Sequence, residues 1–252
     1  MSISIKSEKE IELMRESGRI LAEVLEEVQG MVCSGISTLD IDKKCAELIK
    51  KYDCIPSFLN YNGYPASICI SVNDEVVHGI PKKNRILKNG DIISLDCGVI
   101  YKGFHSDAAR TVGVGEISKE ARRLIDVTQQ SFYEGIKLAK EGYHLHEISE
   151  AIQTYVEAHG YSVVRDLVGH GIGRDLHEEP QIPNFRQKRR GPKLEAGMTL
   201  AIEPMVNAGR YDVYWEDDDW TVVTADGSLS SHYENTVLIT HGEPELLTLL
   251  AK

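Results

Sequence analysis

The chain carries the signs of an internal duplication, and this feature constrains its fold more than any other. Two amphipathic helical patterns, over residues 7–30 and 37–52, are followed by strand-like segments. The same order of two helices and then strands recurs from residue 120 onward. Two further segments, LKNGDIISLD (87–96) and LEAGMTLAIE (194–203), share a leucine, a glycine and a final acid at equal spacing. We therefore expect two similar halves related by a pseudo-two-fold axis.

The element boundaries follow from capping and turn residues. Ser7 with Glu10 forms a capping-box pattern, and Ser37 with Asp40 repeats it. The third helix is expected over 120–140, ending near Gly142, and the fourth is expected over 145–159. Strands are expected at 67–72, 91–100, 107–114, 161–169, 198–206 and 234–240.

The duplication aligns four acidic residues. Asp96 corresponds to Glu203, and Asp107 corresponds to Glu234, because HSDAART (105–111) and HYENTVL (232–238) both begin with histidine, one residue and an acid. If 91–100 and 107–114 form a hairpin that turns near 101–103, Asp96 lies directly opposite Asp107, with Cβ atoms about 4.5–5.5 Å apart. Like charges at that distance repel unless a proton or a cation lies between them. Several carboxylate oxygens favour a divalent cation.

A nitrogen ligand is available in the segment GHGIGRDLHEEP (169–180). His170 is flanked by glycines, which leave room for close approach of a ligand or of the backbone. One imidazole and four carboxylates would balance the charge of two divalent ions. Such a pair of ions can activate a shared water and polarise a carbonyl group.

Composition excludes several classes of protein. A formal net charge of −11 argues against DNA or an anionic membrane as the main partner. No apolar run is long enough to cross a bilayer, and the five cysteines contain no C-x-x-C pair, which favours reduced thiols and a cytoplasmic location. We expect one domain over residues 1–252, with internal halves at about 7–115 and 116–250.

The candidate ligands stand among longer motifs: HGIP (78–81), GHGIGRDLHEEP (169–180) and TLAIEPMVNAG (199–209). Together with these motifs, the acids and His170 resemble the type I methionine aminopeptidases over residues 5–250. The resemblance implies an α+β class with the duplicated pita-bread fold. It also implies hydrolysis of the first peptide bond of polypeptides that begin with methionine and a small second residue. Two divalent ions (Mn, Fe, Co or Zn) are implied as cofactors.

The resemblance also implies a role for each site residue. Asp96 would bind one ion, Asp107 and Glu234 would bridge both, and His170 and Glu203 would complete the other. Glu203 would also accept and return a proton, while His78 and His177 would hydrogen-bond the substrate and the tetrahedral intermediate. The implied substrate pocket consists of Phe58, Tyr61, Tyr64, Cys69, His78, Leu176, His177 and Trp220.

Other implied features lie outside the reaction centre. Asn73 and Ser230 match positions that hold a monovalent cation in the family. Three pocket positions depart from the pattern: Phe58 stands where a cysteine is common, Leu176 where a phenylalanine is common, and Asp219 where a glycine precedes the tryptophan. The implied partners are N-termini of nascent polypeptides, with a transient ribosome contact through the basic run QKRRG (187–191), and the chain is expected to be a monomer.

Three alternatives from other classes share some of these residues. His105 and Asp107, with His170 downstream, imitate the two-histidine, one-carboxylate triad of iron oxygenases, but four long amphipathic helices do not fit a jelly roll. A prolidase or proline-specific aminopeptidase shares the fold and ligands, although such relatives usually carry an extra N-terminal domain and the first helix here starts by Ser7. A non-catalytic binding relative is the third alternative, and the filled ligand positions argue against it.

Overall fold

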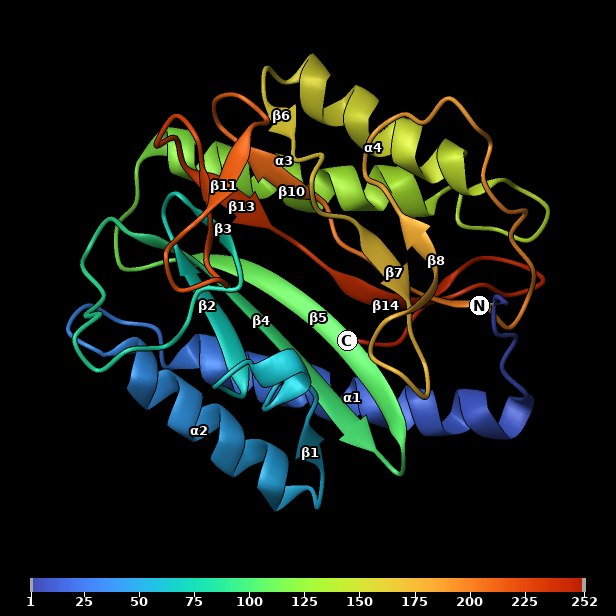
Figure 1. Cartoon of the computed structure of the whole chain (residues 1–252), viewed down its shortest axis with the longest axis horizontal. Coiled ribbons are helices and arrows are strands. Elements are labelled where there is room, and N and C mark those ends of the chain that lie inside the picture. Colours follow the sequence, from blue (N-terminus) through green and yellow to red (C-terminus); the bar gives the residue numbers. More distant parts are fainter. Residues whose placement is uncertain (1, 251–252) are drawn as a thin grey trace.

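The computed structural model describes residues 2–250 of the chain. In this range helices lie on the outside and strands at the centre (Figure 1). The helices are α1 (Glu8–Gly30), α2 (Thr38–Lys51), the 3-10 turn η1 (Tyr61–Gly63), α3 (Lys119–Ile136) and α4 (Leu145–Ala158). The strands are β1 (Ile55–Pro56), β2 (Ile68–Val72), β3 (Glu75–Val77), β4 (Ile92–Tyr101), β5 (Phe104–Gly113), β6 (Ser162–Val163), β7 (Gly169–Gly171), β8 (Glu178–Ile182), β9 (Thr199–Ile202), β10 (Met205–Asn207), β11 (Val213–Trp215), β12 (Val222–Thr224), β13 (Ser230–His232), β14 (Asn235–Leu238) and β15 (Glu245–Leu246).

The predicted order of two helices followed by strands occurs twice. Helices α1 and α2 lie on one side of the strands, and α3 with α4 lies on the other (Figure 1). One antiparallel sheet has the order β1-β4-β2, with β5 paired to β4, and a second has the order β15-β14-β9-β7-β8. Two three-stranded sheets, β13-β10-β6 and β11-β12-β3, complete the layer. The α+β class with a duplicated pita-bread architecture is confirmed.

The two halves join where β5 meets the start of β14. Ala109 and Glu234 exchange backbone hydrogen bonds, with N···O distances of 3.4 Å and 3.0 Å. Beside them, Thr236 Oγ1 accepts from the backbone N–H of Asp107 and donates to its carbonyl, both at 2.9 Å. The correspondence that pairs Asp107 with Glu234 also pairs Ala109 with Thr236. The pseudo-two-fold axis therefore maps the Ala109–Glu234 contact onto the Thr236–Asp107 contact.

The register of the β4–β5 hairpin differs from the prediction. Lys102 and Gly103 both have positive φ values, 47° and 82°, which is the geometry of a two-residue type I′ turn. This turn pairs Tyr101 with Phe104 and moves the register by two positions, so that Asp96 lies opposite Ala109 instead of Asp107. Because side chains alternate with a period of two, the shift leaves both acids on the same face, as diagonal neighbours.

Other boundaries also differ from the sequence prediction. Helix α3 ends at Ile136 and not near Gly142, because Leu138 and Ala139 donate to carbonyls three residues back in tight turns that bury Ala139. Strand β9 stops at Ile202, and pairing resumes in β10 only at Met205. Pro204 lies in this gap and has no N–H to donate to a strand neighbour.

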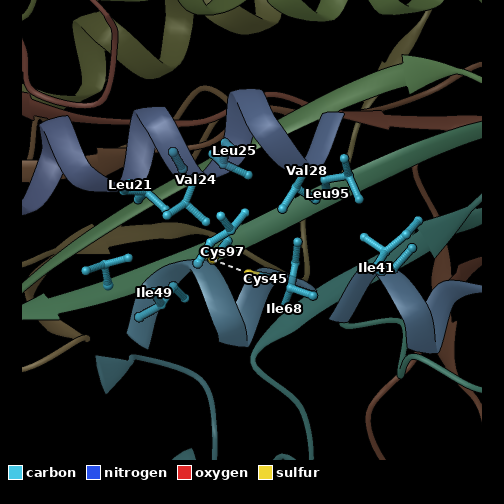
Figure 2. Packing of buried hydrophobic residues seen from close by; sticks show 14 of the residues in the cluster. Leu21, Val24, Leu25, Val28, Ile41, Cys45, Ile49, Ile68, Leu95 and Cys97 are labelled. Atoms are coloured by element: carbon cyan, nitrogen blue, oxygen red, sulfur yellow. Dashed lines mark hydrogen bonds between the residues drawn. The ribbon is translucent and has the colours of Figure 1, made fainter. Parts of the chain in front are cut away.

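Apolar packing fixes both helix pairs against the strands. One cluster joins α1 and α2 to β2 and β4 through the residues drawn in Figure 2: Leu21, Val24, Leu25, Val28, Ile41, Cys45, Ile49, Ile68, Leu95 and Cys97. A second cluster joins α3 and α4 to the strands of the second half, with Phe132 and Ile148 fully buried. Because Cys97 follows Asp96 in β4, the first cluster anchors a strand that carries a candidate ligand. Within residues 2–250, no helix is both long and apolar enough to traverse a membrane.

Candidate metal centre and adjoining pocket

The five candidate ligands converge between the two halves, although they are far apart in sequence. Asp96 lies in β4, Asp107 in β5 and His170 in β7, while Glu203 follows β9 and Glu234 precedes β14. One ligand atom from each of Asp107, His170 and Glu234 lies within 4.8 Å of the others. The Nε2 atom of His170 is 3.7 Å from Oε1 of Glu203 and 3.8 Å from Oδ2 of Asp107. Asp107, His170 and Glu234 thus form one group, Glu203 lies beside His170, and all five predicted ligands, Asp96 included, line the same cavity.

The backbone around His170 allows this approach and orients its ring. A Cβ at Gly169 would lie 2.3 Å from the carbonyl oxygen of Ala201, and one at Gly171 would lie 2.2 Å from that of Glu179. Glycine is thus required on both sides of the histidine. The Nδ1 atom of His170 lies 2.8 Å from the Gly171 carbonyl oxygen, so Nδ1 carries the hydrogen and Nε2 presents a lone pair to the carboxylates.

The acids of this centre are buried together, and this burial raises their pKa values. Burial raises the pKa of Asp96 to about 7 and that of Glu203 to about 8. Burial and the neighbouring carboxylates raise the pKa values of Asp107 and Glu234 well above their usual range. Burial lowers the pKa of His170 to about 3. The centre therefore disfavours four negative charges unless cations compensate them.

This donor set fits divalent metal ions. Among the described residues, Asp96 Oδ1, Asp107 Oδ1 and Glu234 Oε1 are buried oxygens without a hydrogen-bond partner. Buried polar atoms without a partner are costly, and a cation satisfies carboxylate oxygens directly. A neutral imidazole with a free Nε2 adds the nitrogen donor that such ions accept. The residues present are therefore suited to hold divalent ions.

A cavity of about 300 Å³ adjoins the centre. Its walls include all eight residues of the predicted substrate pocket together with the five candidate ligands. Five further wall residues were not predicted from the sequence: Asn62, Val77, Leu167, Val168 and Met205. The wall combines aromatic and aliphatic groups with the carboxylates. Such a cavity can hold an apolar side chain beside a reacting polar group.

The two predicted catalytic histidines both line the cavity. His78 follows β3 with a φ of 61°, an uncommon value for a residue other than glycine, and its ring is 6.4 Å from that of Trp220. His177 has its Nδ1 atom 2.7 Å from the hydroxyl of Tyr61, and its ring is 4.2 Å from that of His170. Burial lowers the pKa values of both histidines, that of His78 to about 4. Both rings are therefore neutral near pH 7.

The residues outside the centre have distinct surroundings. Asn73 has a φ of 60°, and its carbonyl oxygen accepts from the backbone N–H of Ser230 at 2.8 Å, so the two predicted cation-site residues are adjacent. Asp219 has a φ of 64°, which explains why the related family commonly has glycine at this position.

The iron-oxygenase alternative is not supported by the position of His105. Its Nδ1 atom lies 3.0 Å from Ser57 Oγ, and the residue does not line the described cavity. The His105–Asp107–His170 triad therefore does not form there.

One buried residue at the centre was absent from the predicted site. His232 has its Nε2 atom 3.6 Å from Oε2 of Glu203 and is 1% exposed. The signal for it was in the sequence, because His232 occupies the same place before Glu234 that His105 occupies before Asp107. The two histidines nevertheless have different partners in the fold.

Known proteins that resemble this chain include metallopeptidases, in agreement with a site suited to metal ions. A model of metallopeptidase family M24 matches residues 12–241. The methionine aminopeptidase of Clostridium acetobutylicum is 55% identical over 247 residues, which are 98% of this chain and 99% of the relative. The methionine aminopeptidase of Escherichia coli is 45% identical over 250 residues, which are 99% of this chain and 95% of the relative.

Solved structures show the same architecture. The crystal structure of a methionine aminopeptidase from Thermotoga maritima superimposes with a TM-score of 0.97 at 44% identity, covering 99% of this chain and 100% of that one. A prolidase from Pyrococcus furiosus superimposes with a TM-score of 0.77 at 22% identity, covering 98% of this chain but 66% of that one. The second likeness concerns the fold alone.

Proposed function

The chain belongs to metallopeptidase family M24, and we propose that it removes the N-terminal methionine from polypeptides whose second residue is small. The observation that carries this proposal is the cavity of about 300 Å³ whose lining combines aromatic and aliphatic side chains with the four carboxylates and the imidazole of the candidate metal centre. An unbranched thioether side chain fits the apolar part of this lining, and its peptide bond then lies near the carboxylates. Hydrolysis of the first peptide bond follows from that arrangement.

The metal requirement is part of the proposal. Five residues would hold two divalent ions: Asp96, Asp107, His170, Glu203 and Glu234. When bound, such ions lower the pKa of a coordinated water and polarise the substrate carbonyl. Mn, Fe, Co and Zn all accept carboxylate-rich sites with one histidine, so cellular supply decides among them. A monovalent cation near Asn73 and Ser230 remains a prediction.

The protein side chains supply proton transfer and orientation. Glu203 accepts the proton of the attacking water and returns it to the leaving amine, a role open to a carboxylate that lies at the candidate metal centre and lines the cavity. His177 and His78 donate hydrogen bonds to the substrate and to the oxyanion that forms at its carbonyl. Tyr61 supports this role because its hydroxyl lies 2.7 Å from Nδ1 of His177. Tyr64 and Trp220, whose rings are 5.1 Å apart in an edge contact, supply aromatic surface for the substrate side chain.

The cellular setting is proposed on the same basis. Nascent polypeptides are the substrates, and the cytoplasm is where their N-termini emerge. The exposed basic residues Lys188, Arg189 and Arg190 would contact ribosomal RNA transiently. Neutralising all three should weaken co-sedimentation with ribosomes, and unchanged co-sedimentation would refute that contact. The chain is proposed to act as a monomer, which gel filtration tests directly.

A mixture of three peptides tests the proposed reaction. Met-Ala-Ser, Leu-Ala-Ser and Ala-Pro-Ser are incubated with the purified protein, with manganese or with excess chelator, and followed by mass spectrometry. We expect chelator-sensitive loss of methionine from the first peptide only. Cleavage before proline would indicate a prolidase instead, and no cleavage across a panel of metals would favour a non-catalytic relative.

A further inference from the structure

His232 is a buried imidazole beside the metal centre with no assigned role. It ends β13, two residues before Glu234, and is 1% exposed. Among the described residues neither of its ring nitrogens has a hydrogen-bond partner within ordinary distance. The nearest acidic group is the carboxylate of Glu203, whose Oε2 atom lies 3.6 Å from Nε2 of His232. A fully buried polar ring in this position needs a physical explanation.

The backbone of His232 is fixed from the other half of the molecule. Thr111 Oγ1, on β5, accepts from the backbone N–H of His232 at 2.9 Å and donates to its carbonyl oxygen at 2.8 Å. Ser94 on β4 lies 2.7 Å from the same hydroxyl. On the other side, β13 pairs with β10, with His232 opposite Met205. The backbone that carries the imidazole is therefore held by β5 through contacts that do not involve the Glu203 side chain.

The Glu203 carboxylate lies between two imidazoles that differ in what they can donate. Its Oε1 atom is 3.7 Å from His170 Nε2, and its Oε2 atom is 3.6 Å from His232 Nε2. The hydrogen of neutral His170 is on Nδ1, where it bonds the Gly171 carbonyl, so Nε2 of His170 has none to give. Of the two rings, His232 is the one that can donate a hydrogen to Glu203.

We propose that His232 is a positioning residue for Glu203: its Nε2 faces Oε2 at 3.6 Å, a few tenths of an ångström beyond hydrogen-bond length, so that a small shift lets its N–H donate to Oε2 and hold Oε1 toward His170. His232 does not line the substrate cavity, so it acts through Glu203 and not on the substrate. Partners of metal ligands orient the ligand and support metal affinity. This inference rests on the proposed function, in which Glu203 is both a ligand and the proton acceptor.

His105 provides a matched control within the same chain. It occupies the equivalent place in the other half, two residues before Asp107, but its Nδ1 atom lies 3.0 Å from Ser57 Oγ. It therefore has a partner of its own, and no contact with Glu203 joins it to the proton acceptor. Replacing His105 with leucine should leave metal affinity near that of the wild type.

The test compares His232→Gln, which keeps an N–H donor near the position of Nε2, with His232→Leu, which removes it at similar volume. Manganese binding to the chelator-stripped proteins is measured by titration calorimetry, and kcat and KM are measured on Met-Ala-Ser. We expect His232→Leu to lose about 10–100-fold in metal affinity and in kcat, with KM nearly unchanged. His232→Gln should stay within a few-fold of the wild type in all three.

Each outcome bears on the proposal. Wild-type metal affinity in His232→Leu overturns it, and so does an equal loss in folded Gln and Leu variants, because the donor would then not be what matters. Circular dichroism monitors folding, and His232→Phe, which keeps a ring without an N–H, replaces the leucine variant if that fails to fold. Calorimetry measures metal affinity and does not require the protein to cleave a peptide. If the wild type fails to cleave Met-Ala-Ser, the proposed function is rejected, but the effect of His232 on metal affinity can still be measured.

Discussion

The Nζ atom of Lys6 lies 2.6 Å from Oε2 of Glu178, and the two side chains are only 3% and 11% exposed. The other carboxylate oxygen of Glu178 accepts the backbone N–H groups of Arg174 and Asp175, at 2.8 Å and 3.3 Å. The pair therefore ties the N-terminal segment to residues 173–178, which bring His177 to the cavity.

Lys6→Met should destabilise the protein by about 3–5 kcal/mol, because it leaves the Glu178 carboxylate buried without its partner. It should also raise KM, since the loop that carries His177 loses an anchor. Urea unfolding and steady-state kinetics measure the two effects. Adding Glu178→Gln should recover part of the stability. Lys44→Met breaks the exposed Lys44–Glu47 pair and should leave stability near wild type. Equal effects at Lys6 and Lys44 would contradict this account.

Gly18→Ala should destabilise the chain although alanine favours helices. A Cβ at Gly18 in α1 would lie 2.3 Å from the Leu247 carbonyl oxygen. Displacing that backbone should cost about 1–3 kcal/mol, more than the helix propensity of about 1 kcal/mol that alanine adds. Thermal and urea unfolding measure the result. In Gly30→Ala the new Cβ meets no heavy atom within 4 Å, so stability should rise slightly. A gain in both variants would refute the close contact.

Local signals in the sequence predicted much of the fold. The capping box at Ser7 forms with Glu10, and Ser37 accepts from the Asp40 N–H, so α1 and α2 begin where expected. The five candidate ligands meet because the duplicated motifs place acids at equivalent points of a symmetric fold. A motif that is repeated in two halves therefore predicts which residues meet at the symmetry axis, even when the tertiary contacts are not known.

Features that depend on tertiary geometry were not predicted. The diagonal placement of Asp96 and Asp107 follows from the type I′ turn at Lys102 and Gly103, and a sequence pattern alone did not select that turn. The two histidines of the His-x-acid motifs look alike in sequence. Only the fold shows that His105 bonds Ser57 whereas His232 faces Glu203, because these partners come from distant segments.

The stability of the metal-free protein should fall as pH rises from about 6.5 to 8. Burial raises the pKa of Asp96 to about 7 and that of Glu203 to about 8. The same carboxyls have pKa values near 4 in the unfolded chain. In this range the folded chain holds protons that the unfolded chain has lost, so the free energy of unfolding decreases with pH.

The buried histidines do not reverse this trend in that range. Their pKa values are lowered, that of His170 to about 3 and that of His78 to about 4, so their effect appears below about pH 6.5, where the unfolded rings take up protons. Urea unfolding of chelator-stripped protein at several pH values measures the slope. Saturating manganese should flatten it, and a stability that rises toward pH 8 in the stripped protein would be inconsistent with these pKa shifts.

Glu203→Gln should keep the fold and lose about 10²–10⁴-fold in kcat, because the amide has the shape of the carboxylate but cannot accept a proton. Its backbone contact is independent of the change, since Asn184 Nδ2 donates to the Glu203 carbonyl oxygen at 3.0 Å. Kinetics on Met-Ala-Ser at saturating manganese separate this loss from weaker metal binding, and circular dichroism confirms folding. Glu195→Gln changes an exposed acid on the same segment and should retain wild-type turnover. Near-normal kcat in folded, metal-saturated Glu203→Gln would show that another group moves the proton, and the role of Glu203 would then reduce to metal binding.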